Sequence, residues 1–352
     1  MSTTKKSRIF YFDEIRALAI LFVLLIHVSK WFVQELPKHS LDWTFAISLQ
    51  AIGNLGVPLF VTISGALLLN RKYELKSFFK KRYSRILIPF IFWIAVVVLF
   101  RIFFMGHSAS IKGIASIVFT EGYVWFIWML IGVYLFLPVV NSFIREFNMQ
   151  GVRFFVAIWL VTIILGTFGW YPFYKLELSY FAGYIGYFVF GYYLDNEDFK
   201  ISDGSLMKLG LIIYLISTLI YLYCRVNSIY FGETYYLTIL PVVQTTGLFL
   251  FFKYFAQYSE KNEISITNKI YSVIKDSFVG KMIVSISLCS YGMYLTHYLM
   301  IWILMKVNKT TPIFSKNPFI WIPITFLSVV LFSWGIIWIF SKIPYLKEVS
   351  GA

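Results

Sequence analysis

Long apolar segments alternate with short polar segments along the whole chain. Each is about as long as the ~20 residues that a helix needs to cross a bilayer. The segments lie at residues 9–33, 43–70, 84–105, 122–143, 152–169, 176–195, 206–224, 233–254, 282–304 and 318–342. The longest polar gap, near 255–281, is too short to fold by itself. The pattern predicts an all-α fold, a polytopic transmembrane helical bundle of about ten spanning helices, in a single domain over residues 1–352.

The composition supports a membrane protein and excludes other classes. Hydrophobic residues make up 59% of the chain and charged residues 14%, whereas soluble domains carry about 25% charged residues. A soluble enzyme and a disordered chain are therefore excluded. The net charge of +14 is compatible with nucleic-acid binding, but the basic residues lie mostly in short segments between apolar runs, which is typical of cytoplasmic membrane loops. We expect membrane lipid as a partner and no nucleic acid.

The basic residues also predict the orientation in the membrane. With the N-terminus inside, the inner segments carry 21 Lys and Arg residues and the outer loops carry 8. Positive charge accumulates in cytoplasmic loops. We therefore expect a multi-pass protein of the cell membrane with both termini in the cytoplasm.

The first apolar segment, FDEIRALAILFVLLIHVS, carries charged and titratable residues inside a span. Such residues are costly in a membrane and mark candidate functional sites. Arg16 and His27 lie about 20° apart on one helical face, roughly 16 Å apart along the axis, and Asp13 shares that face. This arrangement suits an anionic ligand that enters from the cytoplasm and reacts at depth. The alternative is a structural His27 and an Arg16 that extends to lipid headgroups.

A second polar stripe lies in the ninth apolar segment, within SISLCSYGMYLTHY. Ser287, Ser290, Tyr294 and His297 follow at steps of three, four and three residues, which places them on one helical face. They can line a polar cavity or form hydrogen bonds between helices. We favour interhelical bonding for the two serines and leave both interpretations open for His297.

Segment 71–85 is the strongest basic cluster, and it ends with Arg82 and Arg85 at i and i+3. Two guanidinium groups on one helical face can bind phosphate oxygens. A basic cytoplasmic loop is also expected from topology and anionic lipid alone, so both interpretations stay open.

Pro58 lies inside the second apolar segment. It cannot donate a backbone hydrogen bond, and it clashes with the carbonyl of Asn54. An opened backbone inside a membrane is tolerated where neighbours or a cavity satisfy it. We predict that Pro58 shapes the helix.

Several segments together have the pattern of a known family. They are YFDEIRALAILFVLLIH with Arg16 and His27, GVPLFVTISGALLL (56–69), RYSRILIPFIFW (82–93) with Arg82 and Arg85, WFIWMLIGVYLFLPVV (125–140), FVFGYYL (188–194) and SYGMYLTHYLMI (290–301). With these segments, the chain resembles the integral-membrane acyltransferase 3 family. Within it, the chain looks most like the compact single-domain type that O-acetylates bacterial surface polysaccharides.

The resemblance implies an O-acyltransferase, in the first place an O-acetyltransferase. Its donor would be acetyl-CoA or a related acyl-CoA, and its acceptor a sugar or lipid-linked glycan. The resemblance implies that His27 is the catalytic residue and that Arg16, Arg82 and Arg85 bind the donor. His27 would take the proton from the acceptor hydroxyl as it attacks the thioester, a role that suits histidine near neutral pH. No metal-ligand spacing occurs in the sequence, so we expect no metal.

The supporting residues of such a site are less defined. Tyr294, His297 and Ser290 are candidates for lining a cavity or stabilising the oxyanion. Asp13 is expected to pair with Arg16 at i+3. Cys289, the one thiol near the site, is more typical of a packing residue than of an acyl-enzyme. The alternative function is a transporter or exporter of glycans without acyl-transfer activity, with the polar stripes along a permeation path.

Overall fold

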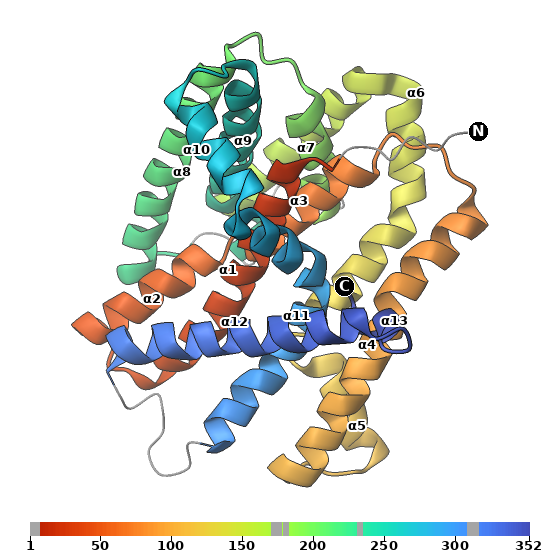
Figure 1. Cartoon of the computed structure of the whole chain (residues 1–352), viewed down its shortest axis with the longest axis vertical. Coiled ribbons are helices and arrows are strands. Elements are labelled where there is room, and N and C mark those ends of the chain that lie inside the picture. The colour runs from red at the N-terminus through yellow and green to blue at the C-terminus, as the bar shows by residue number, and fades with distance from the viewer. Residues whose placement is uncertain (1–7, 170–177, 179–182, 231–234, 308–316) are drawn as a thin grey trace.

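The computed structural model describes residues 8–169, 178, 183–230, 235–307 and 317–352. Within these residues the secondary structure is helical, and no strand occurs. The helices are α1 (Phe10–Glu35), α2 (Leu41–Gly53), α3 (Gly56–Leu68), α4 (Leu75–Met105), α5 (Ile111–Thr120), α6 (Trp125–Thr167), α7 (Ile185–Asn196), α8 (Asp203–Val226), the 3-10 helix η3 (Tyr235–Leu237), α9 (Ile239–Lys261), α10 (Ile266–Asp276), α11 (Phe278–Val307), α12 (Pro318–Lys342) and α13 (Lys347–Ser350). Figure 1 shows their arrangement.

Eight helical segments in the described part of the chain are long and apolar enough to cross a membrane. They are α1, α2 together with α3, α4, α6, α8, α9, α11 and α12. Large apolar side chains are exposed along several of them, for example on α8 and α12, as expected where lipid surrounds the helices. The predicted all-α polytopic bundle is confirmed.

The second apolar segment, 43–70, forms two helices instead of one. α2 ends at Gly53 and α3 begins at Gly56. Pro58 explains the break, because it lacks the N–H that would bond to the carbonyl of Asn54. The N–H of Leu59 then donates to the carbonyl of Leu55 at 3.1 Å, which starts the hydrogen-bond ladder of α3.

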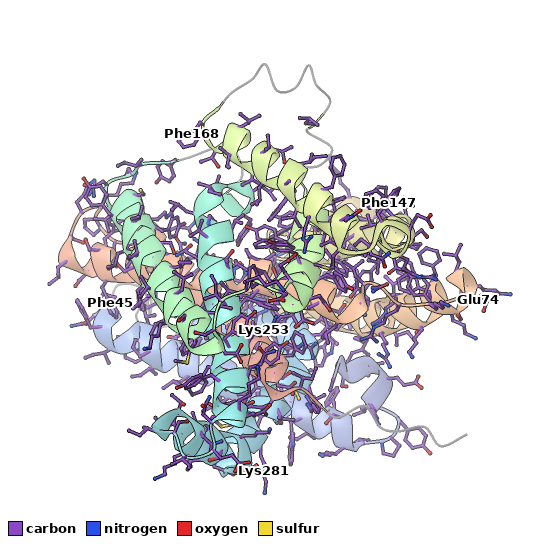
Figure 2. The ribbon with its side chains drawn as sticks, turned by 90° about the horizontal axis from the view of Figure 1, so that it is seen from above. Phe45, Glu74, Phe147, Phe168, Lys253 and Lys281 are labelled. Carbon is purple, nitrogen blue, oxygen red and sulfur yellow. The ribbon has the colours of Figure 1, made fainter. Side chains whose placement is uncertain are left out.

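The predicted segments 122–143 and 152–169 both lie in α6, which changes direction at Asn148. This residue has non-helical dihedral angles, φ 51° and ψ −143°. Figure 2 shows that the part of α6 ending near Phe168 runs in a different direction from the part near Phe147. The predicted segment 176–195 overlaps α7, and most of its first residues lie outside the described residues. These two points explain why eight long spans are found where about ten were predicted.

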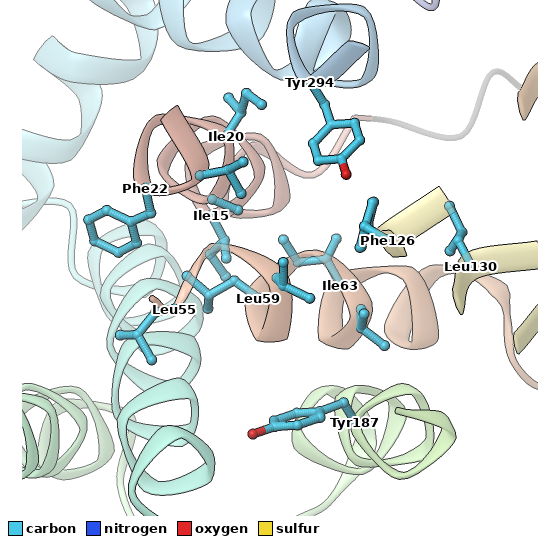
Figure 3. Packing of buried hydrophobic residues seen from close by; sticks show 14 of the residues in the cluster. Ile15, Ile20, Phe22, Leu55, Leu59, Ile63, Phe126, Leu130, Tyr187 and Tyr294 are labelled. Atoms are coloured by element: carbon cyan, nitrogen blue, oxygen red, sulfur yellow. The ribbon is translucent and has the colours of Figure 1, made fainter. Parts of the chain in front are cut away.

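Helix α1 lies at the centre of the bundle. It packs against α2, α3, α9, α11 and α12, and Figure 3 shows its Ile15 and Ile20 among the buried residues of α3 and α11. Glycine permits the closest of these contacts, since a Cβ on Gly56 would lie 2.7 Å from the carbonyl oxygen of Ala19. The polar residues of α1 are therefore enclosed by other helices.

Candidate active site

The polar stripes of α1 and α11 face each other. Hydrogen bonds join the two helices at two levels. The hydroxyl of Ser287 donates to Oδ1 of Asp13 at 2.6 Å, and the hydroxyl of Tyr298 lies 3.0 Å from Nδ1 of His27. The polar stripe of α1 thus meets α11 through Ser287 and His297 of the predicted stripe and through Tyr298 beside it.

His27 lies within a cluster of aromatic rings. Its ring centroid is 4.8 Å from that of Tyr298 and 5.0 Å from that of His297. His27 is partly exposed, whereas His297 is fully buried. Because Tyr298 engages Nδ1 of His27, Nε2 is the ring nitrogen that remains for a substrate.

The surroundings of His297 define its tautomer in the neutral form. Its Nδ1 lies 2.5 Å from the carbonyl oxygen of Tyr294. A carbonyl oxygen only accepts, so Nδ1 carries the hydrogen and Nε2 presents a lone pair. This Nε2 is buried without a hydrogen-bond partner among the described residues. Leaving a buried acceptor unpaired is costly, so Nε2 is available to a polar group that enters the cluster.

Tyr294 and Ser290 lie on the same face of α11 as His297. The hydroxyl of Tyr294 donates to the backbone carbonyl of Tyr123, and Figure 3 shows its ring directed toward Phe126 of α6. Tyr294 would have to release this bond in order to stabilise an oxyanion. Ser290 is buried, one turn before Tyr294.

A cavity lies beside His27. Its lining comes from α1, α2, α3, α6, η3 and α11, and it consists of Val23, Ile26, His27, Gly53, Val57, Trp125, Phe126, Tyr236 and Tyr294. Trp125 and Tyr236 stack with their ring centroids 5.7 Å apart. Polar and apolar atoms contribute about equally to its surface, and the lining includes no acidic, lysine or arginine side chain.

Arg16 of α1 and Arg82 of α4 share one neighbour, Tyr134 of α6. Both guanidinium groups interact electrostatically with Tyr134 of α6. Arg82 is half-buried, and its Nε has no hydrogen-bond partner among the described residues. Neither arginine forms an ion pair with a described carboxylate. Two such cations attract an anionic ligand.

Arg85 and a residue that the sequence did not single out extend this basic region. Arg85 is exposed on α4 and interacts electrostatically with Arg82. Arg82 and Arg145 of α6 both interact with Tyr73. Arg145 had no signal in the sequence, because it lies in a segment that resembles any other inner loop.

The structure corrects the expected partner of Asp13. Its carboxylate pairs with Arg8, whose Nε lies 2.5 Å from Oδ2, and it accepts the hydroxyl of Ser287. No ion pair with Arg16 occurs in the described residues. Arg8 precedes α1 and folds back on its first turn, whereas Arg16 interacts electrostatically with both Asp13 and Tyr134 but forms no ion pair with Asp13. The expected direct pairing of Asp13 with Arg16 is therefore wrong.

Sequence reasoning also missed three aromatic residues around His27. Tyr298 follows His297 directly and lies about 100° away from the stripe on α11. Trp125 and Tyr236 had no signal in the sequence that separated them from the many other aromatic residues. These residues meet His27 only because α6, η3 and α11 converge there.

An ion pair lies at the far end of the aromatic cluster. Arg101 of α4 lies 2.7 Å from Glu121 and 2.6 Å from Nε2 of His107. The guanidinium of Arg101 lies over the ring of Trp302, 4.6 Å from its centroid. Trp302 packs on Tyr298 with centroids 5.5 Å apart. A continuous column of contacts therefore connects the site to the end of the bundle where the outer loops are predicted.

Comparison with known proteins identifies the family. No curated protein and no solved structure matches the chain. A family model described as an acyltransferase domain, of the acyltransferase 3 type, matches residues 9–338. The matched region runs from the start of α1 into α12, so it includes both polar stripes and the paired arginines. The chain therefore belongs to this acyltransferase family, as a multi-pass membrane member.

Proposed function

We propose that the protein is an O-acyltransferase, in the first place an O-acetyltransferase, of the cell membrane. It moves an acyl group from acyl-CoA to a hydroxyl of a surface glycan or lipid-linked sugar. The observation that carries this proposal is His27, which lines a cavity and has Tyr298 at its Nδ1. Family membership supports acyl transfer in general.

The arginines support acyl-CoA as the donor. Arg16 and Arg82 carry charge that no described carboxylate neutralises by an ion pair, and Arg85 lies near Arg82. Guanidinium groups bind phosphates through paired hydrogen bonds, and CoA carries its phosphates at one end and its thiol at the other. The rise from Arg16 to His27 is roughly 16 Å, comparable with an extended pantetheine arm. A donor held by the arginines would bring its thioester to His27.

His27 acts as the general base in this proposal. With Nδ1–H donating to the hydroxyl oxygen of Tyr298, Nε2 holds the lone pair that accepts the proton of the acceptor hydroxyl. The hydroxyl oxygen attacks the thioester carbonyl carbon, so that a C–O bond forms and the C–S bond breaks. The thiolate of CoA leaves and receives the proton from the imidazolium. No net change in charge or oxidation state results.

The column from Tyr298 to Arg101 supports an acceptor that arrives from the outer side. Its aromatic faces and its charged hydrogen-bonding groups are suited to an amphipathic sugar ring. With both termini in the cytoplasm, this end of the bundle is opposite to the arginines. Donor and acceptor would then approach His27 from opposite sides of the membrane.

A glycan transporter or exporter without acyl-transfer activity is the alternative function. A permeation path for a bulky glycan has to be wide and polar across many helices, whereas the cavity at His27 is small. Membership of an acyltransferase family also favours transfer. Glycan movement by the protein in liposomes without an acyl donor would support the alternative.

The proposal is tested by transfer of labelled acetyl from acetyl-CoA in membranes that contain the wild type or His27→Ala. Loss of a general base lowers the rate by roughly 10²–10⁴-fold, and we expect CoA binding to persist in the variant. His39→Ala is the matched control, because His39 is exposed before α2 and should keep full activity. A wild type that neither binds CoA nor transfers label would refute the proposal.

A further inference from the structure

We infer that the cavity beside His27 receives the acyl group of the donor and admits only a short, uncharged acyl chain. Val57 and Ile26 are the residues that set this limit. The inference rests on the proposed function and adds the class of acyl group to the same site.

The position of the cavity supports this assignment. Ile26 directly precedes His27 on α1, and Val23 lies one turn earlier, on the side of Arg16. On α11, Tyr294 likewise lies one turn before Tyr298. The cavity therefore begins at the level of His27. It lies next to the position of the thioester carbonyl carbon, which the hydroxyl oxygen of the acceptor would attack.

The chemistry of the lining selects an uncharged group. Val23, Ile26, Val57 and Phe126 belong to its apolar part, and no lysine or arginine belongs to the lining. A succinyl group would bring a carboxylate into this wall, and burying a carboxylate without a partner is costly. An acetyl group has a methyl end that such a wall accommodates.

The size of the cavity limits the length of the acyl chain. The volume that it offers to the centres of water-sized groups is about 20 Å³, little more than the ~10–15 Å³ that one water molecule needs. The wall at Gly53 cannot retreat easily, because α2 and α1 are in backbone contact there. A Cβ on Gly53 would lie 2.7 Å from the carbonyl oxygen of Phe22 and 2.8 Å from the nitrogen of Ile26.

A sugar ring of the acceptor is the other candidate occupant. A buried pyranose has several hydroxyls, and buried polar groups need hydrogen-bond partners. One nitrogen of His27 is already engaged by Tyr298, and the hydroxyl of Tyr294 donates to Tyr123. The small volume of the cavity also favours the methyl end of an acyl group over a sugar ring.

Purified full-length protein, assayed with acetyl-CoA, butyryl-CoA and succinyl-CoA, tests the inference. One additional methylene in a tight apolar pocket changes the rate by roughly 10–200-fold. We expect Val57→Ala and Ile26→Val to raise the ratio of butyryl to acetyl transfer by about 10-fold each. Val61→Ala is the matched control, because Val61 is buried one turn further along α3 and is not part of the lining. Its ratio should stay that of the wild type.

The outcomes separate this inference from the function on which it rests. Acetyl transfer by the wild type with an unchanged butyryl ratio in both enlarged variants would overturn the inference and leave the proposed function intact. A changed KM for the acceptor glycan, with an unchanged butyryl ratio, would assign the cavity to the sugar. Succinyl transfer as fast as acetyl transfer would also overturn it. If no acyl-CoA serves as donor for the wild type, the proposed function itself fails.

Discussion

The hydroxyl of Tyr298 lies 3.0 Å from Nδ1 of His27 and connects residues 271 positions apart in the chain. The partner at one nitrogen of a histidine sets the tautomer and orientation in which the other nitrogen acts. In the proposed reaction, Tyr298 is therefore a positioning residue that directs Nε2 of His27 toward the substrate.

Tyr298→Phe should lower kcat and leave the KM for acetyl-CoA unchanged. The variant removes the hydroxyl and keeps the ring that stacks on Tyr123 at 4.6 Å. One hydrogen bond contributes about 0.5–1.5 kcal/mol, so kcat should fall by up to about 10-fold. Steady-state kinetics of the purified variant give both constants.

Tyr123→Phe is the control for that experiment. It removes a buried hydroxyl that has no hydrogen-bond partner among the described residues, and it should keep kcat. Equal losses in the two variants would show that the loss does not come from the bond between Tyr298 and His27.

Arg82→Gln should weaken the binding of donors that carry phosphates and leave the binding of donors without phosphates unchanged. A hydrogen bond to a charged group contributes about 1.5–3 kcal/mol, so the KM for acetyl-CoA should rise roughly 10–100-fold. The KM for S-acetyl-pantetheine, which has no phosphate, should not change. Lys80→Gln is the matched control, because it removes one exposed charge from the same helix. Equal effects on both donors would exclude phosphate binding by Arg82.

Asp13→Asn should destabilise the protein without changing donor specificity. The change weakens the ion pair with Arg8 and the bond from Ser287. Arg8 is 45% exposed, so solvent screens the pair, and we expect a loss of about 1–3 kcal/mol. Thermal unfolding in detergent measures this loss of stability. Ser287→Ala should lower the unfolding midpoint by less than Asp13→Asn does. An unchanged unfolding midpoint together with a raised KM for acetyl-CoA would instead place Asp13 at the donor site.

Cys289→Ser should retain acetyl transfer. Cys289 is buried on α11, eight residues before His297, which corresponds to a rise of roughly 12 Å. That separation fits a packing residue. The labelled-acetyl assay tests it, with Cys224→Ser on α8 as the control. A folded Cys289→Ser protein without activity would favour an acyl-enzyme over direct transfer.

Residues that share one helix could be predicted from the sequence. Helical periodicity alone places Arg16 and His27 on one face of α1, and the backbone chemistry of Pro58 explains why α2 and α3 are separate helices. The stripe on α11 was found in the same way, and two of its hydroxyl groups now have identified partners, Ser287 with Asp13 and Tyr294 with Tyr123.

Contacts between helices could not be predicted in this way. Asp13 has a basic neighbour at i+3, yet its partners are Arg8 and Ser287. The sequence did not single out Trp125, yet it lines the cavity at His27. A periodic pattern gives the direction of a side chain around its own helix, but it does not say which helix lies opposite.

The sequence by itself determined that the chain lies in a lipid bilayer, that its fold is all-α, and which polar residues inside the spans are candidates for function because they are costly there. It could do so because hydrophobic length and helical periodicity are local properties of the chain. Only the tertiary structure decided that Tyr298 engages His27, that Arg16 and Arg82 share Tyr134, and that a small cavity without charged residues other than the histidine adjoins it. These relationships depend on how α1, α3, α6 and α11 pack, and the packing is the outcome of many weak contacts over the whole chain.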